Sequence, residues 1–275
     1  MHSSATSKLK GVSGRDHDAV RQVTVLPRFE SDLWYNRDKE IRVMKGDKIM
    51  KYNYVKRKLV ESGYAISEKE INKNGVIRKG IVVNNVVIYP EQYDSMKDII
   101  EVLKSAVVPD VSMVDDRFIL DNVYIGLAKS VDQNIIHQPT HLQGIIQYLY
   151  VKLDDTVSFK LAEGMYHGNM DTLWAAAEAN TFAHTNIFSL GPLAYVVTND
   201  TAYRGASAIL DTSTIRQMLP SGEYVAMPSS IHEFILVKKD PNQDISVYSS
   251  MVDEVNTSTV SPEEQLGSDV YLFEV

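Results

Sequence analysis

Residues 65–90 read AISEKEINKNGVIRKGIVVNNVVIYP, and this stretch decides the fold class of the chain. It contains three strand-like runs, at 65–71, 76–83 and 86–89, and the second and third are rich in β-branched residues. Asn74-Gly75 and Asn84-Asn85 separate the runs, and both dipeptides favour tight hairpin turns. Pro90 ends the third run. The stretch therefore predicts a three-stranded antiparallel meander.

Helical patterns lie on both sides of this meander. In residues 52–62, Val55, Leu59 and Val60 share one face, and Gly63 follows as a C-cap. Residues 95–103 form a second amphipathic pattern, with Met96, Ile99, Ile100 and Leu103 directed inward. The N-terminal part of the fold is thus predicted to be helix, meander and helix.

The rest of the chain mixes predicted strands and helices. We expect strands at 145–153, 157–161, 194–198, 224–227, 234–237 and 270–273, and helices at 171–183, 212–218 and 246–255. Asn169 is expected to cap the first of these helices. Residues 118–130 are ambiguous between helix and strand, with an apolar spacing nearer to that of a helix. Without a regular βαβα series, the pattern predicts an α+β fold with mixed or antiparallel sheets and packed helices.

Composition limits the cellular setting and the partners. The chain has no Cys, which excludes disulfides and thiolate metal sites and favours a cytoplasmic location. Residues 1–104 contain 20 Lys and Arg against 14 Asp and Glu, whereas residues 105–275 contain 8 against 22. An acidic surface repels phosphate, so a nucleic-acid partner is not expected, whereas a protein partner stays open. The longest uncharged stretch, residues 179–199, contains Asn, His, Gly and Pro, so no membrane span is expected.

Three segments are expected along the chain. Residues 1–49 show no sustained helical or strand periodicity. Lys45–Ile49, which precede Met50, can be encoded by a purine-rich ribosome-binding sequence. This favours a non-native or disordered leader, with an authentic docking arm as the rival interpretation. Residues 50–135 then form a subdomain with the N-terminal helix and meander, and residues 136–275 form a larger α+β subdomain.

The C-terminal half contains four motifs, Met227-Pro228-Ser229-Ser230-Ile231-His232-Glu233, Met251–Asn256, Val260–Glu264 and Leu266–Tyr271. These motifs resemble an uncharacterised bacterial family, domain-of-unknown-function family 5688, common in Firmicutes. Weaker similarity occurs at residues 173–181, 195–199, 205–210 and in the meander. Residues 142–150 depart from the family pattern, which has an acidic residue there. A second family of unknown function, numbered 1444, is similar in layout. The resemblance implies fold and cellular setting, and no chemistry.

One short segment is the first candidate site. Ser229, Ser230, His232 and Glu233 bring a hydroxyl, an imidazole and a carboxylate together, the groups of a nucleophile, a base and an orienting acid. Residues this close on an extended chain alternate faces, and no Gly-x-Ser-x-Gly elbow is present. Contact with a ligand or partner, or a turn in which the hydroxyls satisfy backbone groups, are the alternatives.

A helix end gives a second candidate contact. Asn180 and Thr181 are expected near the end of the helix at 171–183, where they either bind a ligand or terminate the helix. His137 and His141 have a spacing that binds metals on helices, but Pro139 lies between them. No metal is therefore expected. No phosphate loop or dinucleotide fingerprint is present, so no cofactor is expected either.

Two functions remain open from the sequence. The first is a non-enzymatic binding or regulatory protein, with carriage on a mobile element as one version. The second is a small hydrolase or ligand-binding enzyme that uses the Pro228–Glu233 turn. A cavity lined by Ser230 and His232 would favour the second, and a flat exposed surface would favour the first.

Overall fold

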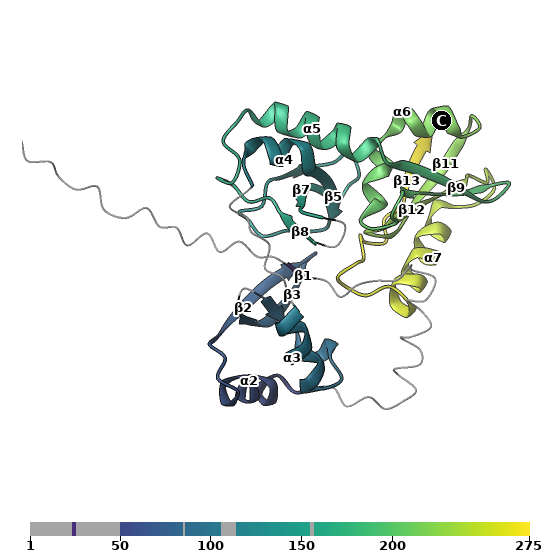
Figure 1. Cartoon of the computed structure of the whole chain (residues 1–275). Helices are drawn as coiled ribbons and strands as arrows, with labels where there is room; N and C mark the ends of the chain where they lie inside the picture. Colours follow the sequence, from purple (N-terminus) through teal and green to yellow (C-terminus); the bar gives the residue numbers. More distant parts are fainter. Residues whose placement is uncertain (1–23, 26–49, 85, 106–113, 155–156) are drawn as a thin grey trace, which may run out of the picture.

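The computed structural model describes residues 24–25, 50–84, 86–105, 114–154 and 157–275, and its N-terminal unit is the predicted meander. Strands β2 (Ile66–Lys73), β3 (Val76–Val83) and β4 (Val86–Ile88) pair antiparallel in that order. Helices α2 (Tyr52–Glu61) and α3 (Met96–Ser105) accompany the sheet, with the short η2 (Pro90–Gln92) between β4 and α3 (Figure 1). Val55, Leu59 and Ile99 are fully buried against the strands. The predicted helix, meander and helix are confirmed, but Val60, expected on the apolar face of α2, is 55% exposed.

The second sheet contains β1 (Thr24–Val25), β8 (Val157–Lys160), β7 (Ile146–Lys152) and β5 (Val123–Ala128), with β6 (His137–Pro139) also paired to β7. Helices α4 (Asp116–Asn122) and α5 (Met170–Phe182) cover one side of it (Figure 1). Asn169 caps α5 as expected, because its side chain accepts hydrogen bonds from the N–H groups of Asp171 and Thr172.

The prediction for residues 118–130 was half wrong. The helix ends at Asn122, and Val123 takes an extended conformation that begins β5. Residues 123–128 read VYIGLA, an apolar run that fits a buried strand as well as a helix. Pairing with β7 decides between the two, and periodicity alone does not contain that information.

The third sheet has the order β13-β11-β12-β10-β9. Its strands are β9 (Thr185–Gly191), β10 (Ala194–Asn199), β11 (Glu223–Ser230), β12 (Glu233–Lys238) and β13 (Tyr271–Glu274). Between β10 and β11 come η4 (Gly205–Leu210) and α6 (Thr212–Met218), and α7 (Ile245–Ser258) follows β12. The sequence analysis did not predict β9.

All strand pairs among the described residues are antiparallel, which confirms the α+β fold. The second sheet joins β5 and β7, which lie on opposite sides of the boundary predicted at residue 135. Its edge pairs Thr24 and Val25 with Ser158 and Val157. Within the described ranges, the model contains no helix long and apolar enough to span a membrane.

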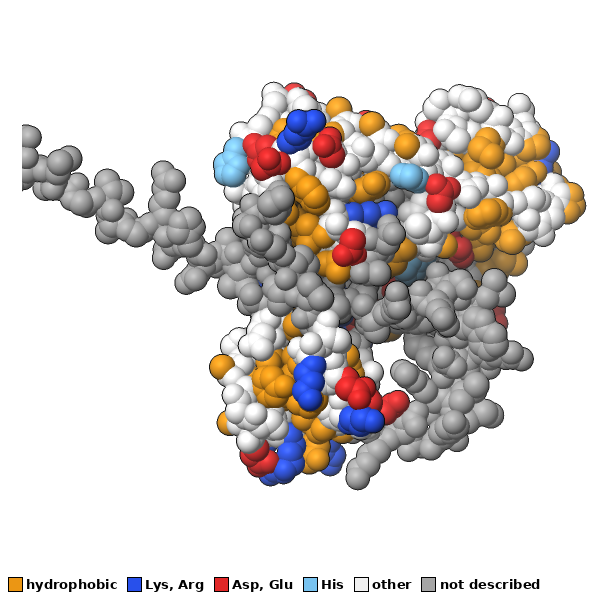
Figure 2. Space-filling model, viewed as in Figure 1, with side chains coloured by type: hydrophobic (Ala, Val, Ile, Leu, Met, Phe, Trp, Pro, Cys, Tyr) orange, Lys and Arg blue, Asp and Glu red, His pale blue; other side chains and the backbone are white. Residues whose placement is uncertain are grey.

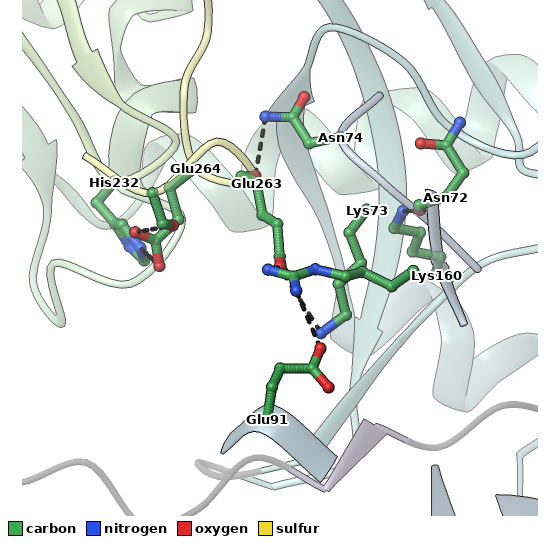
Figure 3. Close-up of polar contacts among 10 residues, drawn as sticks. Asn72, Lys73, Asn74, Glu91, Lys160, His232, Glu263 and Glu264 are labelled. Atoms are coloured by element: carbon green, nitrogen blue, oxygen red, sulfur yellow. Dashed lines mark hydrogen bonds and ion pairs between the residues drawn. The ribbon is translucent and has the colours of Figure 1, made fainter. Parts of the chain in front are cut away.

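The turn between β2 and β3 connects the meander to the other two sheets (Figure 3). Asn74 has φ 53° there, and its side chain donates to the carbonyls of Glu263 and Gln265 at 3.0 and 2.8 Å. Its amide oxygen accepts from the N–H of Lys129 at the end of β5. Glu263 also forms ion pairs with Lys73 and Arg78. One side chain in a hairpin turn thus fixes the meander beside both larger sheets.

Candidate functional site

Strand β7 gives the second sheet two unlike faces, because successive side chains of a strand point to opposite sides. Leu149 and Val151 lie on one face and are fully buried with residues of α4 and α5. Tyr148 and Tyr150 lie on the other face. Tyr124 of β5 is directly opposite Tyr150, and the two rings are stacked with centroids 5.8 Å apart. We call the surface formed by Tyr124, Tyr148 and Tyr150 the tyrosine face.

A glycine makes room for this face. Gly126 is paired with Tyr148 across the β5–β7 ladder. A Cβ atom on Gly126 would lie 2.6 Å from Cζ and 2.7 Å from the hydroxyl of Tyr148, far closer than carbon atoms tolerate. The Tyr148 ring therefore lies flat over the backbone of β5, and only glycine at position 126 permits that.

Each tyrosine of this face has a cation beside its ring. The Nζ of Lys152 lies 4.3 Å from the Tyr124 centroid, and the Nζ of Lys160 lies 5.4 Å from that of Tyr148. The Cζ of Arg204 lies 4.9 Å from the centroid of Tyr150. Cations at such distances are attracted to the ring faces. The face therefore concentrates positive charge in a region of the chain that is acidic on the whole.

Arg204 is held by phenol groups. Its Nη1 donates to the hydroxyl of Tyr148 at 3.0 Å, and its Nε donates to that of Tyr203 at 3.2 Å. None of the ion pairs between described residues includes Arg204. Burial acts to lower the pKa of Arg204, but Tyr148, Tyr203 and Tyr150 outweigh it and raise the pKa. The guanidinium is thus a firmly charged group whose described partners are all neutral at pH 7.

Lys160 brings a second positive charge close to Arg204. Burial, then the charge of Arg204, lower the pKa of Lys160 to about 8, with Lys73 adding to the shift and Asp132 opposing it. Its Nζ donates to the backbone carbonyl of Asn72 at 3.3 Å, near the end of β2. Lys160 and Asn72 lie together in Figure 3. The amine therefore loses its proton much more readily than an ordinary lysine does.

The first candidate site, residues 229–233, contacts the backbone of Arg204. The ring Nδ1 of His232 accepts from the N–H of Arg204 at 3.1 Å, and the carbonyl of His232 accepts from the Thr198 hydroxyl at 2.7 Å. The other ring nitrogen, Nε2, lies 3.8 Å from a carboxylate oxygen of Glu264 (Figure 3). The His232 side chain is 29% exposed, so most of it is buried. His232 thus fixes the backbone at Arg204, which has a φ of 52°.

The serines of this segment bond to other groups than the imidazole ring. Ser230 accepts from the backbone N–H of His232 at 3.0 Å, and Ser229 donates to the Glu233 carboxylate at 3.1 Å. The turn that connects β11 to β12 is tight, with Ser230 paired directly to Glu233. The structure brings all four predicted residues together, in an arrangement that joins the turn to the loop before η4.

The second candidate pair lies at the end of α5. Asn180 donates both hydrogens of its amide to the carbonyls of Leu120 and Val123, at 3.0 and 2.9 Å. The Thr181 hydroxyl donates to Ala177 and accepts from the N–H of Ile125. Both side chains thus fasten α5 to α4 and β5, and a ligand contact at this pair remains a prediction.

Thr181 also lines a cavity of about 260 Å³ at the Tyr124 end of the tyrosine face. Its wall includes Tyr150 and Lys152 from β7, with polar residues from the end of α5 and the loop after β10; the remaining lining residues are Asn122, Tyr124, Leu153, Asp154, His184, Asn199, Asp200, Thr201 and Ser207. His184 and Asp200 face one another, with Nδ1 2.9 Å from Oδ2. Figure 2 shows basic, histidine and acidic side chains gathered near the centre of that view.

His137 lies in a structural setting as well. It belongs to β6, not to a helix, and its Nδ1 lies 2.7 Å from the carbonyl of Ile135. In the part of the chain that the structure describes, no three His, Asp or Glu side chains gather in the manner of a metal site. The expectation that the protein holds no metal remains a prediction.

Sequence reasoning missed Arg204, Lys160 and the tyrosine face. The alternation of Tyr148, Tyr150 and Lys152 in a predicted strand was the available signal, because residues two apart share a face. Arg204 gave no such signal. The position of its side chain depends on a left-handed backbone conformation and on how the third sheet packs beside the second.

The C-terminal part of the chain matches a known family. Residues 147–275 match the model of a family described as "Family of unknown function (DUF5688)". The matched region begins inside β7 and includes Arg204 and the Pro228–Glu233 turn, whereas the meander lies before it. No curated protein and no solved structure matches the chain.

Proposed function

We propose that the protein is a non-enzymatic binding protein whose tyrosine face binds a small anionic ligand through Arg204. The observation that carries this proposal is the guanidinium of Arg204, which the described residues supply with phenol hydroxyls and aromatic rings but with no carboxylate. The lack of Cys supports the further proposal of a cytoplasmic bacterial protein.

The chemistry of arginine favours an anion as the missing partner. A guanidinium presents its N–H donors in a planar fork that matches a carboxylate or a phosphate, and it stays charged when partly buried. Bringing such a charge out of water is costly unless a counter-charge or strong hydrogen bonds compensate. Two phenol hydroxyls take one donor each and leave the remaining N–H groups for a ligand. Lys160 adds positive charge on the same side.

The contacts of the Pro228–Glu233 turn support a scaffold in preference to a hydrolase. A serine nucleophile needs an imidazole nitrogen that accepts its proton. In this turn Nδ1 of His232 accepts from Arg204, and Ser230 accepts from the backbone. These hydrogen bonds support a role for His232 in positioning Arg204.

Calorimetric titration of the full chain with malonate and with inorganic phosphate tests the proposal. We expect the parent protein to bind at least one of these anions, and Arg204→Gln to weaken binding at least tenfold. Arg117→Gln is the matched control, because Arg117 is 91% exposed on α4 and far less constrained. Binding that is equal in the parent and in Arg204→Gln would contradict the proposal. The absence of any binding by the parent would do the same.

A further inference from the structure

The β7–β8 ladder places an unusual amine beside the proposed anion site. Lys160 is paired with Tyr150 across the ladder, so it shares the tyrosine face. Lys160 Nζ and Arg204 Cζ lie 5.4 and 5.9 Å from the centroid of the same ring, that of Tyr148. Lys160 and Arg204 are each partly buried, and the rings of Tyr148 and Tyr150 beside them are buried. A cation that fixes an anion and an amine that is a potential nucleophile therefore lie around one tyrosine.

We propose that Lys160 is a nucleophilic amine that forms an imine with a small 2-oxo acid whose carboxylate is bound by Arg204. This inference rests on the anion site proposed above, and it names the chemical class of the ligand. A 2-oxo acid carries its carboxylate next to the carbonyl carbon. Binding of the carboxylate by Arg204 therefore presents that carbon to a nearby amine.

The electrostatics around Lys160 supply the neutral amine that the reaction requires. A lysine becomes nucleophilic when burial or a neighbouring cation lowers its pKa. Burial and Arg204 do this for Lys160, with a contribution from Lys73, and Asp132 is the acidic group that opposes them. With a pKa of about 8, about a quarter of the amine is neutral at pH 7.5. An exposed lysine at the same pH is almost entirely protonated.

The reaction balances without a redox partner. The lone pair of Nζ attacks the carbonyl carbon, a C–N bond forms, and the carbonyl oxygen takes a proton to give a carbinolamine. The carbinolamine then loses its hydroxyl group and the nitrogen proton as one water molecule, which leaves the C=N bond. The phenol groups of Tyr148 and Tyr203, which hydrogen-bond to Arg204, are suitable to relay these protons.

Reductive trapping on the full chain tests the inference. The protein is incubated with pyruvate and cyanoborohydride at pH 7.5, and the modified lysines are located by peptide mass spectrometry. We expect Lys160 to be modified at least tenfold faster than Lys129, the lysine at the end of β5. Arg204→Gln should reduce the modification of Lys160 at least tenfold, and Lys129→Arg should leave it unchanged. Lys160→Arg should abolish the main adduct while the malonate titration still shows binding.

The outcomes separate this inference from the proposed function. If malonate binds through Arg204 but pyruvate labels Lys160 no faster than Lys129, the imine is excluded and the anion site stands. If the parent binds neither anion nor pyruvate, both proposals are wrong. Thermal melts of Arg204→Gln and Lys160→Arg identify a variant that has unfolded. If a variant has unfolded, the inference is tested by the labelling ratio of Lys160 to Lys129 in the parent protein.

Discussion

The two faces of the second sheet are formed by the same strands, yet their side chains differ in kind. One face carries Ile125, Leu149 and Val151, which are almost fully buried against α4 and α5. The other carries Tyr124, Tyr148 and Tyr150, each with a cation beside its ring. The first face consists of groups whose burial stabilises the fold. The second face is also buried at Tyr148 and Tyr150, but it places positive charges against these rings, where a charge is costly unless it is compensated. Substitutions on the apolar face should therefore affect mainly stability, and substitutions on the tyrosine face should affect mainly anion binding.

The largest effect on stability is expected from the apolar face. Leu149→Ala should lower the free energy of unfolding by about 4 kcal/mol, because Leu149 has no exposed surface and its removal leaves a cavity. Urea unfolding followed by circular dichroism measures this. Leu272→Ala, at a side chain that is 57% exposed, is the control and should cost far less. Equal losses in the two variants would show that the apolar face is not the core we describe.

Gly126→Ala should affect both stability and anion binding. Its new Cβ would overlap the Tyr148 ring, so we expect a loss of about 3 kcal/mol and weaker anion binding, because Tyr148 holds Arg204. Urea unfolding and malonate titration measure the two effects. The double variant Gly126→Ala/Tyr148→Leu should regain part of the stability, but not the binding. If Gly126→Ala retains the stability and the affinity of the parent, the tight packing of Tyr148 on β5 is incorrect.

His232→Ala should cost about 2 kcal/mol. It leaves the N–H of Arg204 without an acceptor and creates a small void. Ser230→Ala should cost less, since water can replace a hydroxyl at a turn. The measurement is urea unfolding of both variants beside a broad hydrolase screen of the parent. Should His232→Ala unfold like the parent while an activity found in the parent disappears, the turn would be an active site and the hydrolase hypothesis would be preferred.

The smallest effect on stability, on the order of 1 kcal/mol, is expected from a change of pH through Lys160, and Lys73, whose pKa burial also lowers, contributes in the same direction. The pKa of Lys160 in the folded protein is about 8, below the ordinary value of 10.5, so the unfolded chain binds more protons between these values. Stability should therefore rise as the pH increases from 7 to 9, because the folded state then loses an unfavourable charge. Lys160→Met should flatten this rise, and Lys129→Met should not. The same rise in Lys160→Met and in the parent would show that Lys160 is an ordinary lysine.

The sequence predicted the local elements well and the site only in part. The Asn-Gly turn, the Asn169 cap and the residues of α6 follow from short-range chemistry, and the structure agrees with them. β5 could not be distinguished from helix, because its apolar run lacks a period and only pairing with β7 defines it. His232 was singled out because of the neighbouring serines and Glu233, whereas its ring Nδ1 accepts from the backbone N–H of Arg204. That partner, Arg204, lies on a distant loop, and the sequence gives no indication of the approach.

The most direct test of the account is the Nε–Hε resonance of Arg204 in a nitrogen-15 NMR titration with malonate. We predict that this resonance is slowed in exchange by its bond to Tyr203 and shifts progressively as malonate binds. The resonance of Arg117, an exposed arginine, should stay in place at the same concentrations. If the Arg204 resonance remains fixed, or moves only in parallel with that of Arg117, then Arg204 serves only to hold the two sheets together and the proposed anion site does not exist.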